Sequence, residues 1–374
     1  MDVRLGDYIQ EYSVRNKAEE DIPVYSVTNS EGFCTGYFDK EVASQDRSTY
    51  KIVPRGCFAY NPSRINVGSV DWQRTVDRVI VSPLYVVFSV SSEVLPQYLY
   101  YYLKSDVALT RIRAKATGSV RDNLKFSMLQ EFPFKLRNRN DQKHIIEVLD
   151  TIHSMTKLYK KQLQTLDQLI KARFVEMFGD IRSNPLGYEK MKLGHTCKVV
   201  TGNTPSRSVS EYYGDYIEWI KTDNIVSGLL NPTKANESLS KEGMKVGKTV
   251  DSNSILMACI AGSVASIGRV CVTDRTVSFN QQINAIIPES YNTLFLYVML
   301  QLSKEYLVED ISMALKGILS KSKLEDKDFI VPPIEQQEQF AAFVFQVDKS
   351  KVVVQEALEK AQLLFDSLMQ QFFG

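Results

Sequence analysis

The chain has 374 residues, of which 44% are hydrophobic and 24% charged, and its formal net charge is +1. This length predicts two or three domains with substantial cores, and the near-neutral charge excludes a uniformly basic nucleic-acid-binding protein. No apolar run approaches the ~18 to 20 residues that cross a bilayer, and no signal-peptide core follows Met1. We therefore expect a cytosolic (cytoplasmic) protein that makes no membrane contact.

The cysteines are dispersed along the chain and form no C-x-x-C pair. An odd, scattered set favours neither a disulfide framework nor a zinc site, so we expect buried, small apolar side chains at these positions. The five residues are Cys34, Cys57, Cys197, Cys259 and Cys271.

The first globular region is predicted to cover residues 1–138 and to mix helices with strands. Segment 78–88 is rich in Val, Ile and Tyr, which is typical of a strand or a strand pair, and segment 97–108 looks helical. A polar tract in this region offers side chains that can pair with base edges in the major groove. Any globular protein has such loop residues, so a plain surface loop is the alternative. The tract consists of Asn61, Ser63, Arg64 and Asn66.

Positive charge concentrates toward the end of the first region. Between residues 111 and 139 there are eight basic side chains and two acidic ones. Such a local field attracts phosphate even when the total charge is near zero, although a solvated surface can have the same composition. The candidate DNA-binding residues of this stretch are Arg111, Arg113, Lys115, Arg121 and Lys125.

A first long helix is predicted over residues 139–180. Neither Gly nor Pro occurs between residues 142 and 178, and Gly179 suits a C-terminal cap. Apolar side chains recur at alternating spacings of three and four, as in the seam of a helix that packs along another helix. Roughly 37 helical residues would make a rod of roughly 55 Å. The helix-pairing candidates are Ile145, Leu149, Ile152, Tyr159, Leu163, Leu166 and Ile170.

The second globular region is predicted to cover residues 181–334 and again mixes strands, at 254–260 and 269–272, with a helix at 293–307. Its charge is mixed in sign, so any phosphate contacts must be local. Its candidate DNA-binding residues are Thr204, Ser206, Arg207, Lys221, Asn224, Gln281, Gln282, Lys316, Lys321 and Lys323.

The second long helix, predicted over residues 335–374, repeats the first. Residues 142–179 align without a gap on residues 337–374, and each copy closes on Phe-Gly. The same seam recurs, and only Lys351 interrupts it. For one such helix, packing on its own domain would be the alternative, but the repeated register favours two helices that pack on each other. The pairing candidates of this copy are Val344, Val347, Val354, Leu358, Phe365 and Leu368.

Duplication on this scale organises the whole chain. We predict an α/β (mixed α+β) fold in which two target-recognition domains are separated by two long antiparallel coiled-coil-like helices related by a pseudo-two-fold axis. The loops of the two regions differ in length and charge, and a duplicated scaffold with unlike loops indicates two sites that read unlike targets.

The motifs of both regions resemble the specificity (S) subunits of type I restriction-modification enzymes. In the second region the resemblance rests on residues 201–206, 217–225, 260–270 and 279–286, and in the first on residues 58–69 and 81–88. Each motif is moderately specific, but their order, repeated twice with a terminal helix each time, covers essentially the whole chain. The resemblance implies a non-catalytic subunit in which each domain recognises one half of a split DNA target.

The same resemblance implies partners and cofactors. The paired helices would hold the half-sites at a fixed spacing on double-stranded DNA and dock two methyltransferase subunits, and a restriction subunit could join them. The chain itself would need no cofactor, whereas its partners would use S-adenosylmethionine, ATP and Mg²⁺. Weakly basic recognition faces, chiefly in the second region, leave open whether the isolated chain binds DNA.

Motifs for independent catalysis are missing from the sequence. The nearest strings to an adenine-methyltransferase motif, at residues 61–64 and 331–334, do not fit it, and no G-x-x-x-x-G-K-[ST] phosphate loop occurs. Three histidines do not suggest a metal or catalytic cluster. Two other hypotheses stay open: a self-contained restriction enzyme with its own nuclease activity, and a protein-binding scaffold that does not bind DNA.

Overall fold

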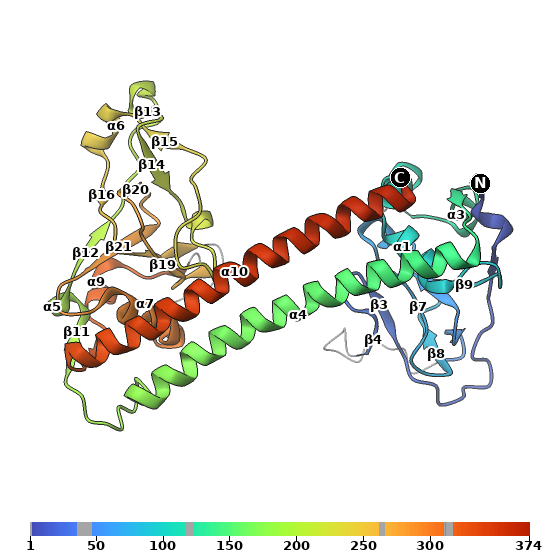
Figure 1. Ribbon diagram of the computed structural model, residues 1–374, viewed down its shortest axis with the longest axis horizontal. Coiled ribbons are helices and arrows are strands. Elements are labelled where there is room, and N and C mark those ends of the chain that lie inside the picture. Colours follow the sequence, from blue (N-terminus) through green and yellow to red (C-terminus); the bar gives the residue numbers. More distant parts are fainter. Residues whose placement is uncertain (1, 36–46, 117–122, 262–265, 310, 312–316) are drawn as a thin grey trace. The chain divides into compact units, whose positions relative to one another are not determined.

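In the computed structural model, the described residues are 2–35, 47–116, 123–261, 266–309, 311 and 317–374. They form two compact units (Figure 1). Unit 1 combines residues 1–159 with residues 357–374, and unit 2 consists of residues 160–356. Each unit therefore contains one globular region, called head 1 (residues 2–138) or head 2 (residues 181–333), together with a segment of both long helices.

Head 1 is built around an antiparallel four-stranded sheet in the order β2-β9-β6-β7. A second antiparallel pair, β1 with β10, joins the start of the head to its end. Helix α1 begins with Pro96 at its first position, where a missing N–H costs nothing, and Ser105 then caps α2 by accepting a hydrogen bond from Ala108 N. The elements are β1 (Asp2–Arg4), η1 (Leu5–Asp7), β2 (Ile9–Glu11), β6 (Phe58–Tyr60), η2 (Ile65–Val67), β7 (Val70–Trp72), β9 (Val86–Val90), α1 (Pro96–Lys104), α2 (Asp106–Lys115), α3 (Phe126–Gln130) and β10 (Pro133–Lys135).

Two smaller strand pairs complete head 1: β3 (Ser26–Thr28) with β4 (Gly32–Cys34), and β5 (Lys51–Pro54) with β8 (Arg78–Val81). The predicted strand segment 78–88 is thus two strands, β8 and β9. A turn in which Tyr85 N donates to Ser82 O, at 3.0 Å, separates them. Likewise, the predicted helix at 97–108 spans α1 and the start of α2, because Ser105 ends one helix and caps the next.

Head 2 repeats this framework element by element. Its four-stranded sheet has the order β12-β21-β17-β19. The first and last strands of the head, β11 and β23, form a separate antiparallel pair. The predicted helix at 293–307 consists of two helices, α7 and α8. The repeated elements are β11 (Lys190–Lys192), α5 (Leu193–Thr196), β12 (Cys197–Thr201), β17 (Ile255–Ala258), β19 (Val270–Val272), β21 (Ile283–Pro288), α7 (Thr293–Leu302), α8 (Lys304–Val308), α9 (Lys321–Glu325) and β23 (Asp328–Ile330).

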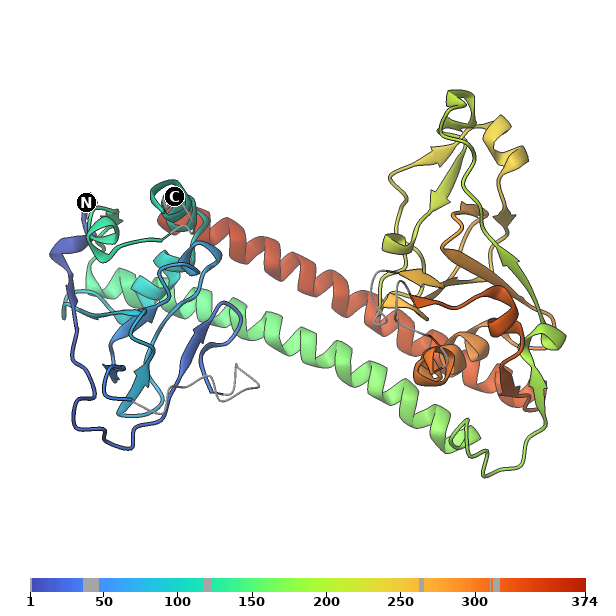
Figure 2. The ribbon, with the colours of Figure 1, turned by 180° about the vertical axis from the view of Figure 1, so that it is seen from behind.

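Head 2 also has a five-stranded sheet in the order β13-β15-β14-β20-β16, in which β14 and β20 are parallel and the other pairs antiparallel. Figure 2 shows this sheet projecting beyond the four-stranded framework of head 2. Among its described residues, head 1 has two strand pairs at the corresponding stage of the chain, β3 with β4 and β5 with β8. The additional elements are η3 (Ser210–Tyr212), β13 (Tyr213–Gly214), β14 (Ile217–Ile220), η4 (Thr222–Asn224), β15 (Ser238–Leu239), α6 (Lys241–Val246), β16 (Thr249–Val250), β18 (Ile260–Ala261), β20 (Val277–Phe279) and β22 (Gly317–Ile318).

The long helices are α4 (Arg139–Phe178) and α10 (Ile334–Phe373). In unit 2 the end of α4 meets the start of α10, because the Phe178 ring lies 5.6 Å from the Phe340 ring. The residues equivalent to this pair after the 195-residue shift, Phe373 and Ile145, share the core of unit 1. The helix segments are therefore antiparallel in each unit and pair in the same register.

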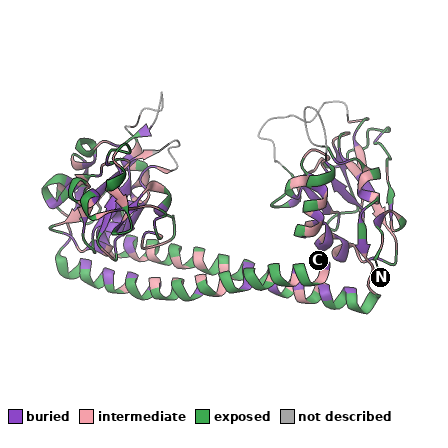
Figure 3. Ribbon diagram, turned by 90° about the horizontal axis from the view of Figure 1, so that it is seen from above, coloured by how far each residue is buried: buried purple, intermediate pink, exposed green. Residues whose placement is uncertain are grey.

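The seam residues predicted from the sequence lie toward the interior of this pairing. Ile145, Leu149, Ile152, Val344, Val347 and Val354 are buried, and Tyr159, Leu163, Leu166, Ile170, Leu358, Phe365 and Leu368 are half-buried. Figure 3 shows buried residues concentrated inside the heads, while much of each helix is exposed. The stripe thus faces a protein interior along the whole helix, as hydrophobic burial requires.

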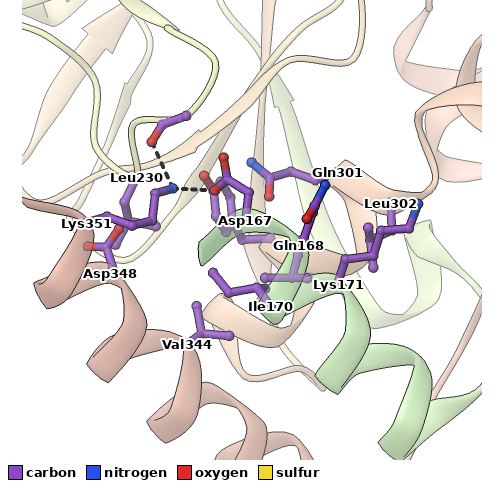
Figure 4. A pocket seen from close by; sticks show the side chains of 13 residues that line it. Asp167, Gln168, Ile170, Lys171, Leu230, Gln301, Leu302, Val344, Asp348 and Lys351 are labelled. Atoms are coloured by element: carbon purple, nitrogen blue, oxygen red, sulfur yellow. Dashed lines mark hydrogen bonds and ion pairs between the residues drawn. The ribbon is translucent and has the colours of Figure 1, made fainter. Parts of the chain in front are cut away.

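Lys351, which interrupts the seam on α10, contacts two other segments of unit 2 (Figure 4). Its side chain is 13% exposed, its Nζ lies 2.8 Å from Asp167 Oδ1 of α4, and it donates a hydrogen bond to Gly228 O of head 2 at 3.0 Å. Asp348 lines the same pocket of about 290 Å³. Burial raises the pKa of Asp348, with Asp167 adding to the rise and Lys351 opposing it. A half-buried cation at a seam position, paired with a residue of the facing helix, favours one register of a helix pair.

Two equivalent glutamines join each head to a long helix. Gln142 Oε1 accepts from Leu95 N at 2.8 Å, and its Nε2 donates to Glu93 O and Arg137 O. Gln337, one repeat later, accepts from Asn292 N at 2.9 Å and donates to Pro332 O at 2.7 Å. Both side chains are fully or almost fully buried. Each glutamine therefore ties the residue that caps α1 or α7 to the first turn of the long helix.

Candidate nucleic-acid interface

In unit 1, the predicted polar tract forms a single tight turn after β6. Asn61 Oδ1 accepts hydrogen bonds from the backbone N and the Oγ of Ser63, at 3.1 and 3.0 Å. This Asx turn starts η2, which buries Ile65 and leaves Arg64 exposed, and Gly68 ends it with a φ of 91°. The turn therefore presents Arg64 to solvent on a backbone fixed by its own side chains.

The basic stretch of unit 1 meets this turn from two sides. Arg113 Nε of α2 donates to Asn66 O at 3.1 Å. On the other side, Leu124 N donates to Pro62 O at 3.1 Å, which places the neighbouring Lys125 beside the turn. The structure thus brings together two tracts that lie far apart in the sequence. We call them the unit 1 surface: Asn61, Ser63, Arg64, Asn66, Arg113 and Lys125.

Two other predicted basic residues of α2 are engaged within head 1. Arg111 Nη1 donates to Pro133 O at 3.3 Å and to the Tyr102 hydroxyl at 3.4 Å. Lys115 Nζ lies 2.8 Å from Glu131 Oε2, and its hydrogen bond and charge lower the pKa of that carboxyl. The ion pair with Glu131 leaves Lys115 less available to a phosphate than a lone surface lysine. Arg121 lies outside the described residues.

In unit 2, a close backbone approach at Gly202 starts the candidate surface. A Cβ atom at this position would lie 2.2 Å from Asn280 O and 2.5 Å from Phe279 O, so only glycine fits. The segment that follows thereby reaches the turn after β20, where the Thr204 hydroxyl donates to Gln281 Oε1. Asn203 Nδ2 donates to Val246 O at 2.9 Å, which ties the segment after Gly202 to the end of α6.

Two cations of head 2 lie against aromatic rings. The Arg207 guanidinium lies 4.5 Å from the Tyr213 ring and 5.2 Å from the Trp219 ring, and Lys221 Nζ lies 5.1 Å from Trp219. Stacking of this kind orders a charged side chain without removing its charge. The unit 2 surface is defined as Thr204, Arg207, Lys221, Gln281 and a fifth residue, Glu237.

Glu237 lies between the two cations. Its Oε2 is 2.6 Å from Arg207 Nη2, and its Oε1 accepts a hydrogen bond from Lys221 Nζ. The Lys221 hydrogen bond, followed by the contact with Arg207, lowers the pKa of the Glu237 carboxyl against a partial desolvation. Sequence reasoning missed Tyr213, Trp219 and Glu237. Alternation in β14 could have placed Trp219 beside Ile217 on one face, but no local pattern connects Glu237 to Arg207.

The other predicted residues of unit 2 lie elsewhere. Asn224 is buried, and its side chain accepts from Lys221 N at 3.0 Å and donates to Thr233 Oγ1 and Lys234 O, so its polar groups serve the fold. Ser206 is exposed and pairs with Ser208, and Gln282 Oε1 accepts from Asn280 Nδ2 within a turn. Lys321 and Lys323 belong to α9, where Lys321 pairs with Glu325 at 3.5 Å. Lys316 lies outside the described residues.

Metal-ligand clusters and membrane-spanning helices are absent from the part of the chain that the structure describes. Within those residues no three His, Cys, Asp or Glu side chains gather as metal ligands, and none of the helices could span a bilayer. Four cysteines are buried as expected, and burial raises the pKa of Cys197, Cys259 and Cys271 to about 12. Cys34 is the exception, because it is partly exposed.

Comparison with known families gives a double match. The family described as "Type I restriction modification DNA specificity domain" matches residues 7–168 and again residues 185–362. Each match contains one head and part of the long helix that follows it. The two copies together cover most of the chain, which agrees with the internal duplication.

Relatives and solved structures point the same way. The type I restriction enzyme HindI specificity subunit of Haemophilus influenzae is 33% identical over 119 residues, which are 31% of this chain but only 25% of that protein. The MjaIX specificity subunit of Methanocaldococcus jannaschii is 23% identical over 306 residues, 75% of this chain and 69% of that protein.

Two solved structures are similar in fold. The S subunit of a type I restriction-modification system from M. genitalium has a TM-score of 0.62 at 14% identity and covers 100% of this chain and 96% of its own. A chain from a study of complex assembly and conformational transition in a type I R-M system has a TM-score of 0.58 at 16% identity, with coverages of 100% and 97%. At these identities the likeness concerns the fold alone.

Proposed function

The chain belongs to the family of type I restriction-modification DNA specificity domains, and we propose that it is the DNA-recognition subunit of such a system, reading a bipartite target with one head per half-site. The observation that carries this proposal is the double family match, combined with two unlike polar surfaces on one repeated framework. A repeated scaffold keeps the geometry constant, while different loops read different bases.

Each head is proposed to use its surface in two ways. Cations such as Arg113 and Lys125 in unit 1 would neutralise phosphates and set the orientation of the duplex. Arg64 in unit 1 and Arg207 or Gln281 in unit 2 would reach base edges, since arginine pairs with guanine and glutamine with adenine in the major groove. The chain itself would be non-catalytic, and its partners would supply S-adenosylmethionine, ATP and Mg²⁺ chemistry in the cytoplasm.

Mapping methylated adenines in a host with and without the gene, beside its methyltransferase, tests this function directly. We expect one split motif that appears only with the gene. Exchanging head 2 for the head of another specificity subunit should then alter one half-site and leave the other unchanged. Cleavage or methyl transfer by the purified chain alone, with DNA, Mg²⁺ and S-adenosylmethionine, would contradict the non-catalytic role.

The long helices are proposed to set the distance between the half-sites. One heptad is about 10 Å of helix, which corresponds to about three base pairs of B-DNA. Deleting one heptad from both helices should therefore shorten the unread spacer by about that amount and leave both half-site sequences intact. An unchanged spacer in the methylation map would show that the helices do not set the distance between the half-sites.

Two methyltransferase subunits are proposed to dock on the helices, one in each unit. Two exposed apolar positions recur in both copies of the repeat: Leu158 (62% exposed) corresponds to Val353 (67%), and Leu169 (46%) to Leu364 (51%). Each unit thus carries one residue of each pair. Exposed apolar side chains at repeated positions are typical of a repeated protein interface.

Charged substitutions separate docking from folding. Leu158→Glu with Leu364→Glu should remove one methyltransferase from the complex, and the addition of Leu169→Glu and Val353→Glu should remove both, as read by native mass spectrometry. Val175→Glu is the matched control, because Val175 is 48% exposed but its equivalent in the second copy, Gln370, is polar. Full occupancy in the quadruple variant would place the methyltransferases elsewhere.

A further inference from the structure

The unit 2 surface contains one carboxylate that faces the cations proposed to contact DNA. Glu237 contacts Arg207 through Oε2 and Lys221 through Oε1. Its side chain is 35% exposed, and those of Arg207 and Lys221 are 56% and 31% exposed. Parts of all three side chains are therefore exposed, although Glu237 Oε2 itself is buried, and the single carboxylate contacts both cations.

The cations are positioned by contacts that do not involve Glu237. Arg207 lies against Tyr213 and Trp219, the Tyr213 hydroxyl donates to Pro205 O at 2.7 Å, and Trp219 is 2% exposed. Trp219 Nε1 also donates to Asn203 O at 3.3 Å. Both rings, Tyr213 and Trp219, are hydrogen-bonded to backbone carbonyls. Departure of the Glu237 carboxylate would therefore leave Arg207 and Lys221 near their present positions.

Glu237 is held less completely than a structural carboxylate of the same head. Glu218 receives aligned hydrogen bonds from Arg275 Nε and Nη2, at 3.0 and 2.9 Å, and from Ala235 N at 2.8 Å. By contrast, the contacts of Glu237 are with two side-chain cations, Arg207 and Lys221, and it has no counterpart to the backbone hydrogen bond from Ala235 among the described contacts. Partly exposed ion pairs are weak because solvent screens them, so a phosphate, which carries the same sign of charge, can compete with this carboxylate for both cations.

We propose that Glu237 is a specificity-determining residue that occupies Arg207 and Lys221 in the place of a DNA phosphate and yields them only when head 2 meets its own half-site. This inference rests on the proposed DNA-recognition function. On unrelated DNA the two cations stay paired with Glu237 and contribute no phosphate contact. On the correct half-site, base contacts offset the loss of the carboxylate, and both cations engage the duplex.

The substitution Glu237→Gln tests the proposal in the full chain bound to its methyltransferase partner. With two cations released, affinity for a random-sequence duplex should rise several-fold. The slope of log K against log salt should also become steeper by about 1.8, because each of the two new phosphate contacts contributes roughly 0.9. Affinity for the duplex identified by methylation mapping should rise less, and its slope should stay constant. Glu242→Gln, which removes the same charge from an exposed pair with Lys245, is the matched control.

Fluorescence reports on the site independently. The chain has two tryptophans, so Trp72→Phe in head 1 leaves Trp219 as the sole reporter, directly beneath Arg207. In this background only the mapped duplex should change the Trp219 emission while Glu237 is present, whereas both duplexes should change it after Glu237→Gln. Emission that responds equally to both duplexes in the presence of Glu237 would overturn the proposal.

The other possible outcomes distinguish a failure of the DNA-recognition function from a failure of the role proposed for Glu237. If the complex binds neither duplex, the proposed function itself fails. If it binds both normally but Glu237→Gln behaves like Glu242→Gln, recognition stands and the role of Glu237 is refuted. If Glu237→Gln instead abolishes binding of the mapped duplex alone, Glu237 reads a base as an acceptor and does not stand in for phosphate.

Discussion

Head 1 and head 2 share their four-stranded sheet, their terminal strand pair and their glutamine joint, but their candidate surfaces occupy different places on that framework. In unit 1 the surface is the turn after β6 with α2 beside it. In unit 2 it is built largely on the five-stranded sheet around Trp219, and the described residues of head 1 form no such sheet. Duplication has preserved the packing positions and left the polar positions free to differ.

Energetics explains this division. A residue such as Phe340 or Ile145 contacts several buried neighbours, so most changes there create a cavity or a clash. A surface residue such as Arg64 or Arg207 can change with little effect on stability. Two copies of one framework can therefore acquire different DNA targets while keeping one way of attaching to the long helices.

The largest effect is expected at the helix seam. Phe340 is fully buried, with the Phe174 and Phe178 rings 5.4 and 5.6 Å away. Phe340→Ala should lower the unfolding free energy of unit 2 by about 3 to 5 kcal/mol, and Ile145→Ala at the equivalent place in unit 1 by about 2 to 5 kcal/mol. Amide hydrogen exchange resolved by unit is the measurement. Equal loss of protection in both heads after either change would mean that the units do not unfold separately.

The glutamine joints should give intermediate and matching effects. Gln142→Ala and Gln337→Ala each leave a part-buried backbone N–H, that of Leu95 or Asn292, without its acceptor, at a cost of about 1 to 3 kcal/mol in unfolding free energy. Gln162→Ala, at an exposed position of α4, serves as the control and should stay within about 0.5 kcal/mol of the unmodified chain. A large difference between the two joints in denaturant titrations would show that the repeat is symmetric in shape but not in stability.

The salt dependence of DNA binding should distinguish the cations of unit 1. Arg113→Gln and Lys125→Gln should each reduce the log–log slope by about one, because each would remove one of the phosphate contacts proposed for this surface. Lys115→Gln should change it less, since Glu131 already neutralises Lys115. If Arg113 and Lys125 together leave the slope unchanged, the unit 1 surface is an ordinary solvated face.

The smallest effect is expected at Asp348 in unit 2. Because burial raises its pKa, the folded chain binds this proton more tightly than the unfolded chain. Above the pKa that Asp348 has in the folded chain, its ionised carboxyl therefore lowers the unfolding free energy. This loss disappears as the pH falls toward the pKa that Asp348 has in the unfolded chain. Asp348→Asn should raise the melting temperature slightly at neutral pH and leave it unchanged in acid. A lower melting temperature at neutral pH would mean that Asp348 stabilises Lys351 more than burial costs it.

Much of the architecture was predictable from the sequence. The gap-free repeat of residues 142–179 at 337–374 and its 3.5-residue spacing predicted both long helices and their seam, because hydrophobic periodicity is a local property. Motif order predicted the family that the double match confirms. Helix limits such as Ser105 were missed, since a capping serine within an apolar stretch is a weak local signal.

The surfaces themselves were decided by the tertiary structure. Arg113 meets Asn66, and Glu237 meets Arg207, only because the fold brings together segments that are distant in sequence. Asn224, a reasonable base-reading candidate by residue type, is instead consumed by a buried hydrogen-bond network. Sequence by itself determined the repeated framework and the helices, because apolar spacing specifies which faces are buried. Which polar side chains remain available to a partner depends on long-range packing, and no local pattern records it.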